Sequence, residues 1–552
     1  MRSALLKLWL AVVAIALFID LGAFPLFDAD EGRNGEVGRE MAATNDYVMP
    51  RIDGMPYLDK PIVYFAAEAA AMEILGPTEL AARLPSYLFT LLTGLIIFLF
   101  ARRVWGEDEA VIASIAYLSM PLTLAFARTV IFDSALSFFM IGALIAFYFA
   151  VECHANAVIL RRADAEGTVS QARDGSFAAL RRLRMTAAKR WSTLAWASIA
   201  LGVLTKGPVA IAVPLLVAIV YAIRRKAFRA LWSWWGLVAF IAIIAPWVWA
   251  VSQVVPDFLH YVLVTETAQR LATKALKRTG PPWYFIPYLI GGALPWSIAT
   301  AMSWRRKERD EPMIFAAIWI LVTFVFFSIS QSKRPQYILP VMPAIALMAA
   351  RMWMRSDRWI VAARIAASIF IVVGVVLIAL PFVHVKMQPE IAEGAHSSAL
   401  PMGIASLMAG FAFIKRREIA LIALTIPIIT IPLTANPLMN AIGARRSAKS
   451  FVAQLPHDVR VVGVENFTGS MAFYLRRDFD VVTPDAEEFT SNYIIRHYDQ
   501  FANDPKSPVK RTLMLERGVI YIVRNNDAAH RAMLEQSGFK VIASSPHHIA
   551  YR

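Results

Sequence analysis

Long apolar runs alternate with short polar segments along most of the chain. A run of about 20 apolar residues is long enough to cross a membrane as a helix. The pattern predicts about thirteen such spans, which lie near 5–23, 82–101, 108–127, 130–150, 191–206, 208–223, 231–251, 284–302, 313–330, 336–351, 359–381, 400–414 and 418–434. We therefore expect a multi-span α-helical membrane protein.

The first apolar run resembles a signal peptide but lacks its cleavage site. It is followed by Phe24, Pro25, Leu26 and Phe27 rather than by small residues, so we expect an uncleaved first span with a cytoplasmic N-terminus. Residues 24–81 then form an outer, periplasmic loop. Within it, 31–43 and 62–75 have helical patterns interrupted by charged residues, which predicts two helices lying on the outer membrane surface.

Lysine and arginine are concentrated in alternate loops, as the positive-inside rule requires. Each predicted inner loop carries at least one of them: 101–109, 152–190, 224–229, 305–311, 351–358 and 415–418. The cytoplasmic loop 152–190 is the most basic, and we interpret it either as an amphipathic helix on the inner leaflet or as a solvated linker. An odd number of spans places the C-terminus outside.

The sequence changes character near Asn436. Short strand-like runs such as VRVVGV and GVIYIV alternate with helical segments such as FTGSMAFYL and DAAHRAMLEQSG. This alternation predicts a small periplasmic α/β domain over 436–552, after a transmembrane domain over 1–435. The C-terminal segment has no glycine-rich phosphate loop, so no nucleotide site is expected there.

The overall composition agrees with a membrane protein. Hydrophobic residues make up 58% of the chain and the mean hydropathy is +0.52, which excludes a water-soluble globule. The net charge of +15 comes from Lys and Arg placed between apolar runs, so topology explains it better than nucleic-acid binding does. The single cysteine, Cys153, excludes an intrachain disulfide.

The first outer loop carries the densest group of polar residues. Its sequence DADEGR contains an Asp-x-Asp tripeptide, Asp28 and Asp30, followed by Glu31 and Arg33. Asp-x-Asp can hold a divalent cation on a sugar-linked phosphate, although such tripeptides also arise by chance in solvated loops. Asp28 and Asp30 are thus the candidate ligands if a metal is used. Four charges exceed what an interfacial anchor needs.

Lys60 ends the same loop, directly after Asp59 and before Pro61. A lysine at this place can act as a point charge on a lipid phosphate. It can equally extend its ammonium group to the lipid headgroups without any catalytic role. The local sequence does not separate these two interpretations.

Asp133 lies inside the apolar run TVIFDSALSFF, where an ionisable group is costly unless it is paired or hydrated. It is therefore either a functional residue or half of a structural ion pair, and Arg128 is its candidate partner. Lys206, in LTKGP, is expected to be only a turn residue between two spans.

Two further outer segments carry candidate residues. In 252–283, Glu266 and Arg270 are four positions apart, so they either pair on a helix or contact a substrate. The segment 331–335 contains Arg334, and Tyr337 follows it at the start of the next span. This places a cation beside an aromatic ring at the membrane edge. Seven polar residues then fall on the outer side of the membrane: Asp30, Arg33, Lys60, Asp133, Glu266, Arg334 and Tyr337.

These motifs also resemble a known family. The order DADEGR, EVGREM, PYLDKP, FDSAL and KRPQYILPVMPA, between residues 28 and 344, is similar to the polyprenyl-phosphate-sugar glycosyltransferases of the GT-C fold. The nearest branch contains lipid A 4-amino-4-deoxy-L-arabinose transferase and is related to the protein O-mannosyltransferases. Asn34, where an aromatic residue is expected, and Asp59, where Glu is usual, depart from the family pattern.

The resemblance implies roles for individual residues. It implies that Asp30 is the catalytic carboxylate and that Asp133 is a further active-site residue. It implies that Arg33, Lys60 and Tyr337 contact the carrier phosphate. Negative charge developing on that phosphate would be stabilised by Arg33, Lys60 and Arg334. The remaining candidates are substrate contacts: Asp28, Glu31, Asp59, Glu266 and Arg270.

The expected function is sugar transfer from an undecaprenyl-phosphate carrier to lipid A or a related envelope glycolipid. The reaction would take place on the periplasmic face of the bacterial inner membrane, and 4-amino-4-deoxy-L-arabinose is one candidate sugar. One alternative is a protein O-mannosyltransferase-like enzyme that uses the same class of donor. Another is a flippase for lipid-linked sugars, which would predict repeated halves and charged mid-membrane paths that the sequence does not show.

Overall fold

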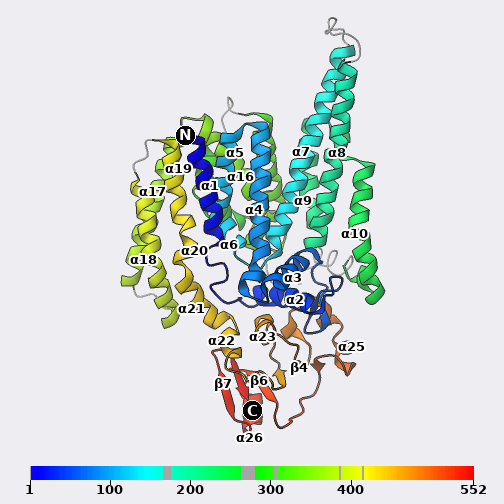
Figure 1. Cartoon of the computed structure of the whole chain (residues 1–552), viewed down its shortest axis with the longest axis vertical. Coiled ribbons are helices and arrows are strands. Elements are labelled where there is room, and N and C mark those ends of the chain that lie inside the picture. Colours follow the sequence, from blue (N-terminus) through cyan, green and yellow to red (C-terminus); the bar gives the residue numbers. More distant parts are fainter. Residues whose placement is uncertain (1, 166–175, 263–279, 304–308, 384–386, 413–415) are drawn as a thin grey trace.

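The protein is a long helical bundle with a smaller mixed domain at one end (Figure 1). The computed structural model describes residues 2–165, 176–262, 280–303, 309–383, 387–412 and 416–552. The bundle contains α1 (Arg2–Phe18), α4 (Glu79–Val104), α5 (Glu107–Leu118), α6 (Pro121–Ala127), α7 (Phe132–Ala165), α8 (Ser176–Lys206), α9 (Val209–Arg224), α10 (Trp234–Val254), α13 (Phe285–Gly291), α14 (Trp296–Met302), α15 (Glu311–Ile329), α16 (Met342–Arg355), α17 (Trp359–Ala379), α18 (Pro389–Phe411), α19 (Arg417–Ile429) and α20 (Ile431–Thr434). Short helices η1 (Phe228–Leu231), α11 (Phe258–His260), η4 (Pro335–Val341) and η5 (Leu380–Phe382) connect them.

The predicted membrane segments all coincide with helical structure. Among the described residues, seven helices are long and apolar enough to cross a membrane, or up to nine if the bent pairs α5–α6 and α13–α14 each count as one span. The shorter apolar helices include Ala4–Phe18 and Val209–Arg224. A multi-span helical membrane fold is therefore confirmed, whereas the count of thirteen spans stays a prediction.

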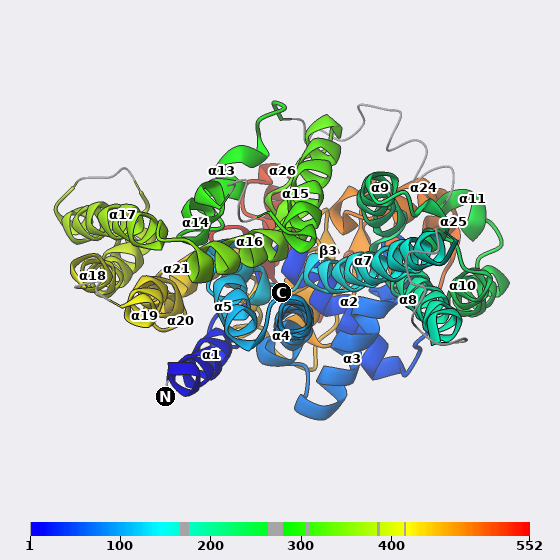
Figure 2. The same cartoon turned by 90° about the horizontal axis from the view of Figure 1, so that it is seen from above.

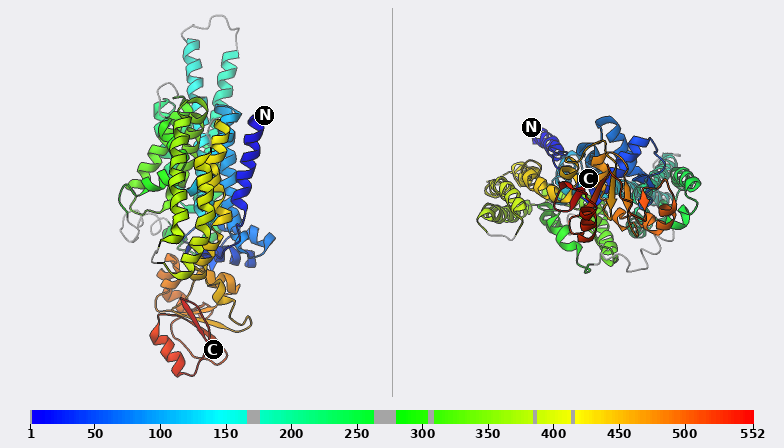
Figure 3. Two further views of the ribbon diagram at one scale, coloured as in Figure 1. Left: turned by 90° about the vertical axis from the view of Figure 1, so that its left-hand side faces the viewer. Right: turned by 90° about the horizontal axis from the view of Figure 1, so that it is seen from below.

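Helices α4 and α16 lie near the centre of the bundle, with α17 and α18 at one edge and α8 and α10 at the other (Figure 2). The close packing of α7 against α8 extends beyond the other helices, at the end opposite the small domain (Figure 3). The described parts of the predicted inner loop, 152–165 and 176–190, are continuations of these two helices. They do not form a separate amphipathic surface helix, because they continue α7 and α8, and the solvated character of this loop stays a prediction.

The outer loop 24–81 folds into two helices and a small hairpin. The predicted helices are confirmed as α2 (Asp30–Thr44) and α3 (Val63–Leu75). Between them, β1 (Arg51–Ile52) pairs with β2 (Met55–Pro56) across Asp53 and Gly54, which both have positive φ as a tight two-residue turn requires. Helix α2 is largely buried between α3 and the C-terminal domain, so it is enclosed by protein rather than laid on a lipid surface.

The C-terminal segment contains a six-stranded sheet of order β5-β4-β3-β6-β8-β7. Strands β3 to β6 run parallel, whereas β8 is antiparallel to both β6 and β7. The elements are α21 (Asn436–Arg446), α22 (Lys449–Val452), β3 (Val461–Val464), α23 (Gly469–Leu475), β4 (Asp480–Val482), η6 (Glu487–Phe489), α24 (Asn492–Arg496), α25 (Tyr498–Asn503), β5 (Val509–Lys510), β6 (Ile520–Arg524), α26 (Ala528–Gln536), β7 (Val541–Ser544) and β8 (His548–Tyr551). The predicted α/β character is confirmed.

Candidate functional site

Asp30 is held between two arginines where the bundle meets the C-terminal domain. It is the first residue of α2. Arg33 Nη2 lies 2.7 Å from Asp30 Oδ1, and Arg334 Nη1 lies 2.8 Å from Asp30 Oδ2. Arg33 reaches the carboxylate because residues three apart share one face of a helix. The Asp30 side chain is still 41% exposed, so this cluster of charges is accessible.

Arg33 also contacts the C-terminal domain. Its Nη1 donates a hydrogen bond of 2.8 Å to Thr490 Oγ1, and its guanidinium lies 6.0 Å from the centre of the Tyr57 ring. Burial opposes the charge of Arg33, but Tyr57, Asp30 and Asp59 outweigh it and raise the pKa of Arg33 above its ordinary value. The arginine therefore remains a cation, and the C-terminal domain takes part in positioning it.

A chain of contacts leads from Asp30 to Asp133. Arg334 and Tyr337 lie in one turn, in which the Tyr337 backbone N–H donates to the Arg334 carbonyl. Lys206 Nζ lies 4.9 Å from the centre of the Tyr337 ring and donates hydrogen bonds of 2.6 Å to both carboxylate oxygens of Asp133. Asp133 is only 3% exposed, so Lys206 balances a buried charge.

Lys206 is the functional candidate that the sequence analysis missed. The predicted partner of Asp133, Arg128, is wrong: Arg128 donates to the carbonyls of Leu17, Ile19 and Asp20 at the end of α1. Lys206 was predicted to be only a turn residue, but it is the last residue of α8 and forms the ion pair with Asp133. The predicted topology already placed Lys206 on the outer side, which was the available signal.

Lys60 and Asp59 have different surroundings although they are adjacent. Lys60 is partly exposed, and its Nζ donates to the Asp59 carbonyl at 2.7 Å. The Asp59 carboxylate is buried and accepts hydrogen bonds from the Tyr261 hydroxyl and from the Asn492 backbone N–H. Asp59 therefore joins the outer loop to the start of α24 rather than facing a substrate.

Glu31 is likewise a structural residue. Arg83, which is fully buried, donates to both of its oxygens at 3.0 and 2.9 Å, and the backbone N–H groups of Val130 and Phe27 complete the set. No oxygen of Glu31 is left for a ligand. The predicted substrate contact at Glu31 is thus replaced by a buried ion pair between α2 and α4.

Asp28 connects the outer loop to the C-terminal domain. Its carboxylate accepts hydrogen bonds from the backbone N–H and the hydroxyl of Ser470, in α23. Burial raises the pKa of Asp28 to about 6, although these hydrogen bonds oppose the rise. Asp28 and Asp30 therefore have different partners, and within the described part of the chain no third acidic or histidine side chain joins them as a metal ligand.

The raised pKa of Asp28 predicts a pH-dependent stability. A folded-state pKa above the ordinary value means that protonation favours the folded state, so this contribution is full at low pH and is lost as the pH rises through about 6. We expect Asp28→Asn to flatten the fall in Tm between pH 5 and pH 7.5 by the equivalent of about 1 kcal/mol. Parallel Tm curves for wild type and variant would contradict this role; Asp504→Asn, an exposed acid of the same domain, is the control.

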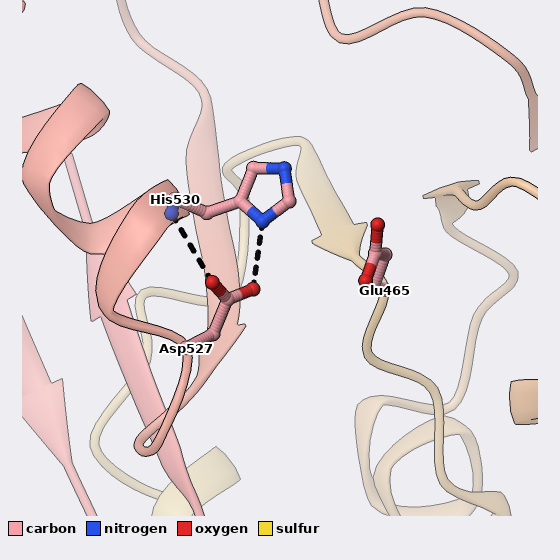
Figure 4. A group of neighbouring side chains, drawn as sticks. All are labelled: Glu465, Asp527 and His530. Atoms are coloured by element: carbon pink, nitrogen blue, oxygen red, sulfur yellow. Dashed lines mark hydrogen bonds and ion pairs between the residues drawn. The ribbon is translucent and has the colours of Figure 1, made fainter.

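A group of possible metal ligands lies elsewhere in the C-terminal domain (Figure 4). Asp527 accepts a hydrogen bond from the His530 backbone N–H and pairs with His530 Nδ1 at 2.7 Å. Glu465 follows β3, and one of its oxygens lies within 4.8 Å of the ligand atoms of this pair, although no hydrogen bond between Glu465 and the pair is drawn. Asp527 caps the N-terminus of α26, so helix capping explains the pair. Helix α26 lies at the far end of the domain from α2 (Figure 1).

Two predicted site residues, Glu266 and Arg270, lie outside the described residues. The same holds for the basic residues that follow them in the segment 263–279. Their predicted contacts with a substrate stay predictions.

The chain is similar to several known proteins. A family described as dolichyl-phosphate-mannose-protein mannosyltransferase matches residues 59–160. An undecaprenyl phosphate-alpha-4-amino-4-deoxy-L-arabinose arabinosyl transferase of Proteus mirabilis is 29% identical over 356 residues, covering 62% of this chain and 59% of the relative. The protein of the same name from Aeromonas hydrophila is 29% identical over 333 residues, covering 59% and 56%. The chain therefore matches well under two thirds of these relatives' length.

Solved structures extend the similarity to nearly the whole chain. ArnT from Cupriavidus metallidurans bound to undecaprenyl phosphate has a TM-score of 0.81 at 25% identity, and the match covers 99% of this chain and 97% of ArnT. Its apo structure has a TM-score of 0.79 at 24% identity, with the same coverage. The chain has the ArnT fold, and its predicted resemblance to the GT-C polyprenyl-phosphate-sugar glycosyltransferases is confirmed.

Proposed function

We propose that this chain is a glycosyltransferase that moves a sugar from a polyprenyl-phosphate carrier to an acceptor in the cell envelope. The carbohydrate is 4-amino-4-deoxy-L-arabinose, the carrier is undecaprenyl phosphate and the acceptor is lipid A. The observation that carries this proposal is the accessible cluster of Asp30, Arg33 and Arg334. It occurs in a fold matched along its length by ArnT bound to undecaprenyl phosphate.

The two arginines suit the leaving group. As the bond between the anomeric carbon and the phosphate oxygen breaks, its electron pair passes to the phosphate. Arg33 and Arg334 stabilise the charge that develops there, because a guanidinium offers five N–H donors and can hold Asp30 and a phosphate together. Lys60, one residue beyond Asp59, supplies a third cation.

Asp30 positions these arginines. Its two oxygens accept hydrogen bonds from two different guanidiniums. To act as a general base, Asp30 would have to lose one of these charge-assisted hydrogen bonds. A phosphate of lipid A is already an anion and attacks the sugar without a base. This makes an anionic acceptor the better match to the observed cluster, whereas a hydroxyl acceptor would need Asp30 to take its proton.

The pair of Asp133 and Lys206 supports the site from within the bundle. Lys206 is fixed by the Asp133 carboxylate and lies against the Tyr337 ring, in the same turn as Arg334. We infer that Lys206 and Tyr337 hold this turn at the height that the carrier phosphate reaches, with Tyr337 as a phosphate contact.

The proposed orientation is an N-terminus in the cytoplasm and a C-terminal domain in the periplasm of a bacterial inner membrane. The N-terminus and the projecting ends of α7 and α8 lie at the same end of the bundle, opposite the C-terminal domain (Figures 1 and 3). The basic ends of α4 and α9 support this orientation, through Arg102, Arg103, Arg224 and Arg225.

A second candidate is a protein O-mannosyltransferase-like activity with the same class of donor. It is favoured by the match of residues 59–160 to the mannosyltransferase family. In that case the acceptor is a Ser or Thr hydroxyl, and Asp30 would act as the general base.

The test is a transfer assay with the purified full chain in detergent. Undecaprenyl-phosphate 4-amino-4-deoxy-L-arabinose and lipid A are supplied, and modified lipid A is measured by mass spectrometry. We expect formation of a lipid A species one aminopentose heavier, and its loss in the Arg33→Ala/Arg334→Ala variant. Transfer to a peptide instead would favour the second candidate. Movement of intact donor across proteoliposomes without any transfer would indicate a flippase and contradict the proposal.

A further inference from the structure

Three carboxylates meet on the side of α2 that faces the C-terminal domain, and a fourth, that of Asp53, lies near them. Glu36 and Glu40 project from α2, and their oxygens lie within 4.8 Å of one another and of an Asp478 oxygen. Asp53, in the turn of the β1–β2 hairpin, accepts a hydrogen bond of 2.9 Å from the Phe479 backbone N–H, directly after Asp478. We call these four residues the acidic cluster. It joins the outer loop to the C-terminal domain.

The acidic cluster has little neutralising charge. Among the described residues, Arg39 is the only cation in ion-pair contact with it: Arg39 binds both Glu36 oxygens at 2.7 and 2.6 Å and lies 3.9 Å from Asp478. The arginines that line the adjoining pocket have other partners: Arg460 binds Asp480 and Glu516, Arg51 lies 3.6 Å from Asp46, and Arg477 donates to the Val459 carbonyl. In the described structure, the four acidic groups therefore have one guanidinium in direct contact, and it binds Glu36 and Asp478.

Two oxygens of the acidic cluster are buried without a partner. Glu40 is 4% exposed and Asp53 is fully buried. Each uses one oxygen, since Glu40 Oε1 accepts from the Gly54 backbone N–H and Asp53 Oδ1 from Phe479. Within the described structure, Glu40 Oε2 and Asp53 Oδ2 accept no hydrogen bond. A buried carboxylate oxygen without a donor is costly, so a proton or a cation must satisfy it.

Burial also raises the pKa of these carboxyls, to about 7 for Glu36 and about 8 for Glu40. Their donors are all oxygens, which Ca²⁺ and Mg²⁺ prefer. A solvent pocket of about 600 Å³ reaches the cluster, since Asp53, Gly54 and Asp478 line it; the Asp478 side chain is 51% exposed.

We propose that Glu36, Glu40 and Asp478 bind one divalent cation, Ca²⁺ or Mg²⁺, beside Asp53, and that this cation fastens the C-terminal domain to α2. Two ligands come from the helix that begins at Asp30 and one comes from the C-terminal domain, and Asp53 lies in the adjacent hairpin. The cation stabilises the docked arrangement by bridging segments far apart in the sequence. This structural site is separate from Asp30, and it does not depend on the proposed sugar transfer.

The test measures the binding of ⁴⁵Ca²⁺ and thermal unfolding of the full chain, purified in detergent and freed of metal with a chelator. We expect one Ca²⁺ per chain and a saturable rise in Tm of about 2–4 °C, with Mg²⁺ as a competitor. Asp478→Asn should remove both effects, as should Glu40→Gln. Because Asp478 is partly exposed, its variant should fold even if the buried Glu40 variant does not.

Asp504→Asn is the matched control, because Asp504 lines the same pocket but lies outside the acidic cluster. It should bind Ca²⁺ as wild type does. NaCl at equal ionic strength should not reproduce the rise in Tm. The proposal would be overturned if wild type bound no Ca²⁺ and gained stability only on acidification, which would mean that protons alone satisfy the carboxyls. Equal binding by wild type and Asp478→Asn would overturn it too.

Discussion

Asp30→Asn is expected to lower kcat/KM for sugar transfer by about 100- to 1000-fold. The amide keeps the size of the side chain but removes the charge that holds Arg33 and Arg334 together. The two guanidiniums would then repel each other and lose the geometry that receives the carrier phosphate. The measurement is the initial rate of transfer with purified protein at several donor concentrations.

The matched control for this variant is Asp504→Asn, which should transfer sugar at the wild-type rate. The Tm of Asp30→Asn should change little, because Asp30 is 41% exposed and Arg33 keeps its hydrogen bond to Thr490. Transfer at the wild-type rate by Asp30→Asn would remove Asp30 from the site.

Lys206→Met is expected to destabilise the protein by roughly 3–5 kcal/mol, because it leaves the buried Asp133 carboxylate without its cation. The yield of folded protein in the membrane and its Tm in detergent should both fall. Transfer should fall as well, since Lys206 also contacts the ring of Tyr337.

The double variant Lys206→Met/Asp133→Asn separates charge from packing. Removing both charges should recover most of the lost Tm, and the two single effects should be strongly non-additive. If the double variant were as unstable as the sum of the two single variants, the ion pair would not be the reason for the loss. If Tm recovered but transfer did not, Lys206 and Asp133 would be required for transfer itself and not only for the stability of the fold.

Local sequence was sufficient for most of the secondary structure. The helices α2 and α3 and the strands β3 and β6 were predicted because their helical or strand-like patterns extend over several residues. Strand β5 has only two residues, too few to show a pattern. Strand β8, with the sequence HIAY, is stabilised by its pairing with β6 and β7, and local sequence carries no signal for such partners.

The acidic residues of the first outer loop show what sequence could not decide. Asp28, Glu31 and Asp59 are acidic like Asp30 and lie in the same loop, 24–81. Their partners come from distant segments: Ser470 for Asp28, Arg83 for Glu31 and Tyr261 for Asp59. Only Asp30 keeps an exposed carboxylate in the arginine cluster, and this difference arises from tertiary packing alone.

Tertiary packing also explains why the role of Lys206 was not predicted from the sequence. The motif LTKGP correctly predicts the end of a helix, since α8 ends at Lys206 and Gly207 has a positive φ. The bond to Asp133 joins residues 73 positions apart, and nothing in the local sequence indicates it. Helix packing between α7 and α8 is what brings the two charges together.

The most direct test of the proposed function is mass spectrometry of lipid A from cells that express this chain, cells that lack it, and cells that express Asp30→Asn at equal level. We expect an aminopentose-sized addition to lipid A only with the wild-type chain. Unchanged lipid A in all three strains, with the donor present and the protein in the membrane, would contradict lipid A as the acceptor. An addition that persists with Asp30→Asn would contradict the site.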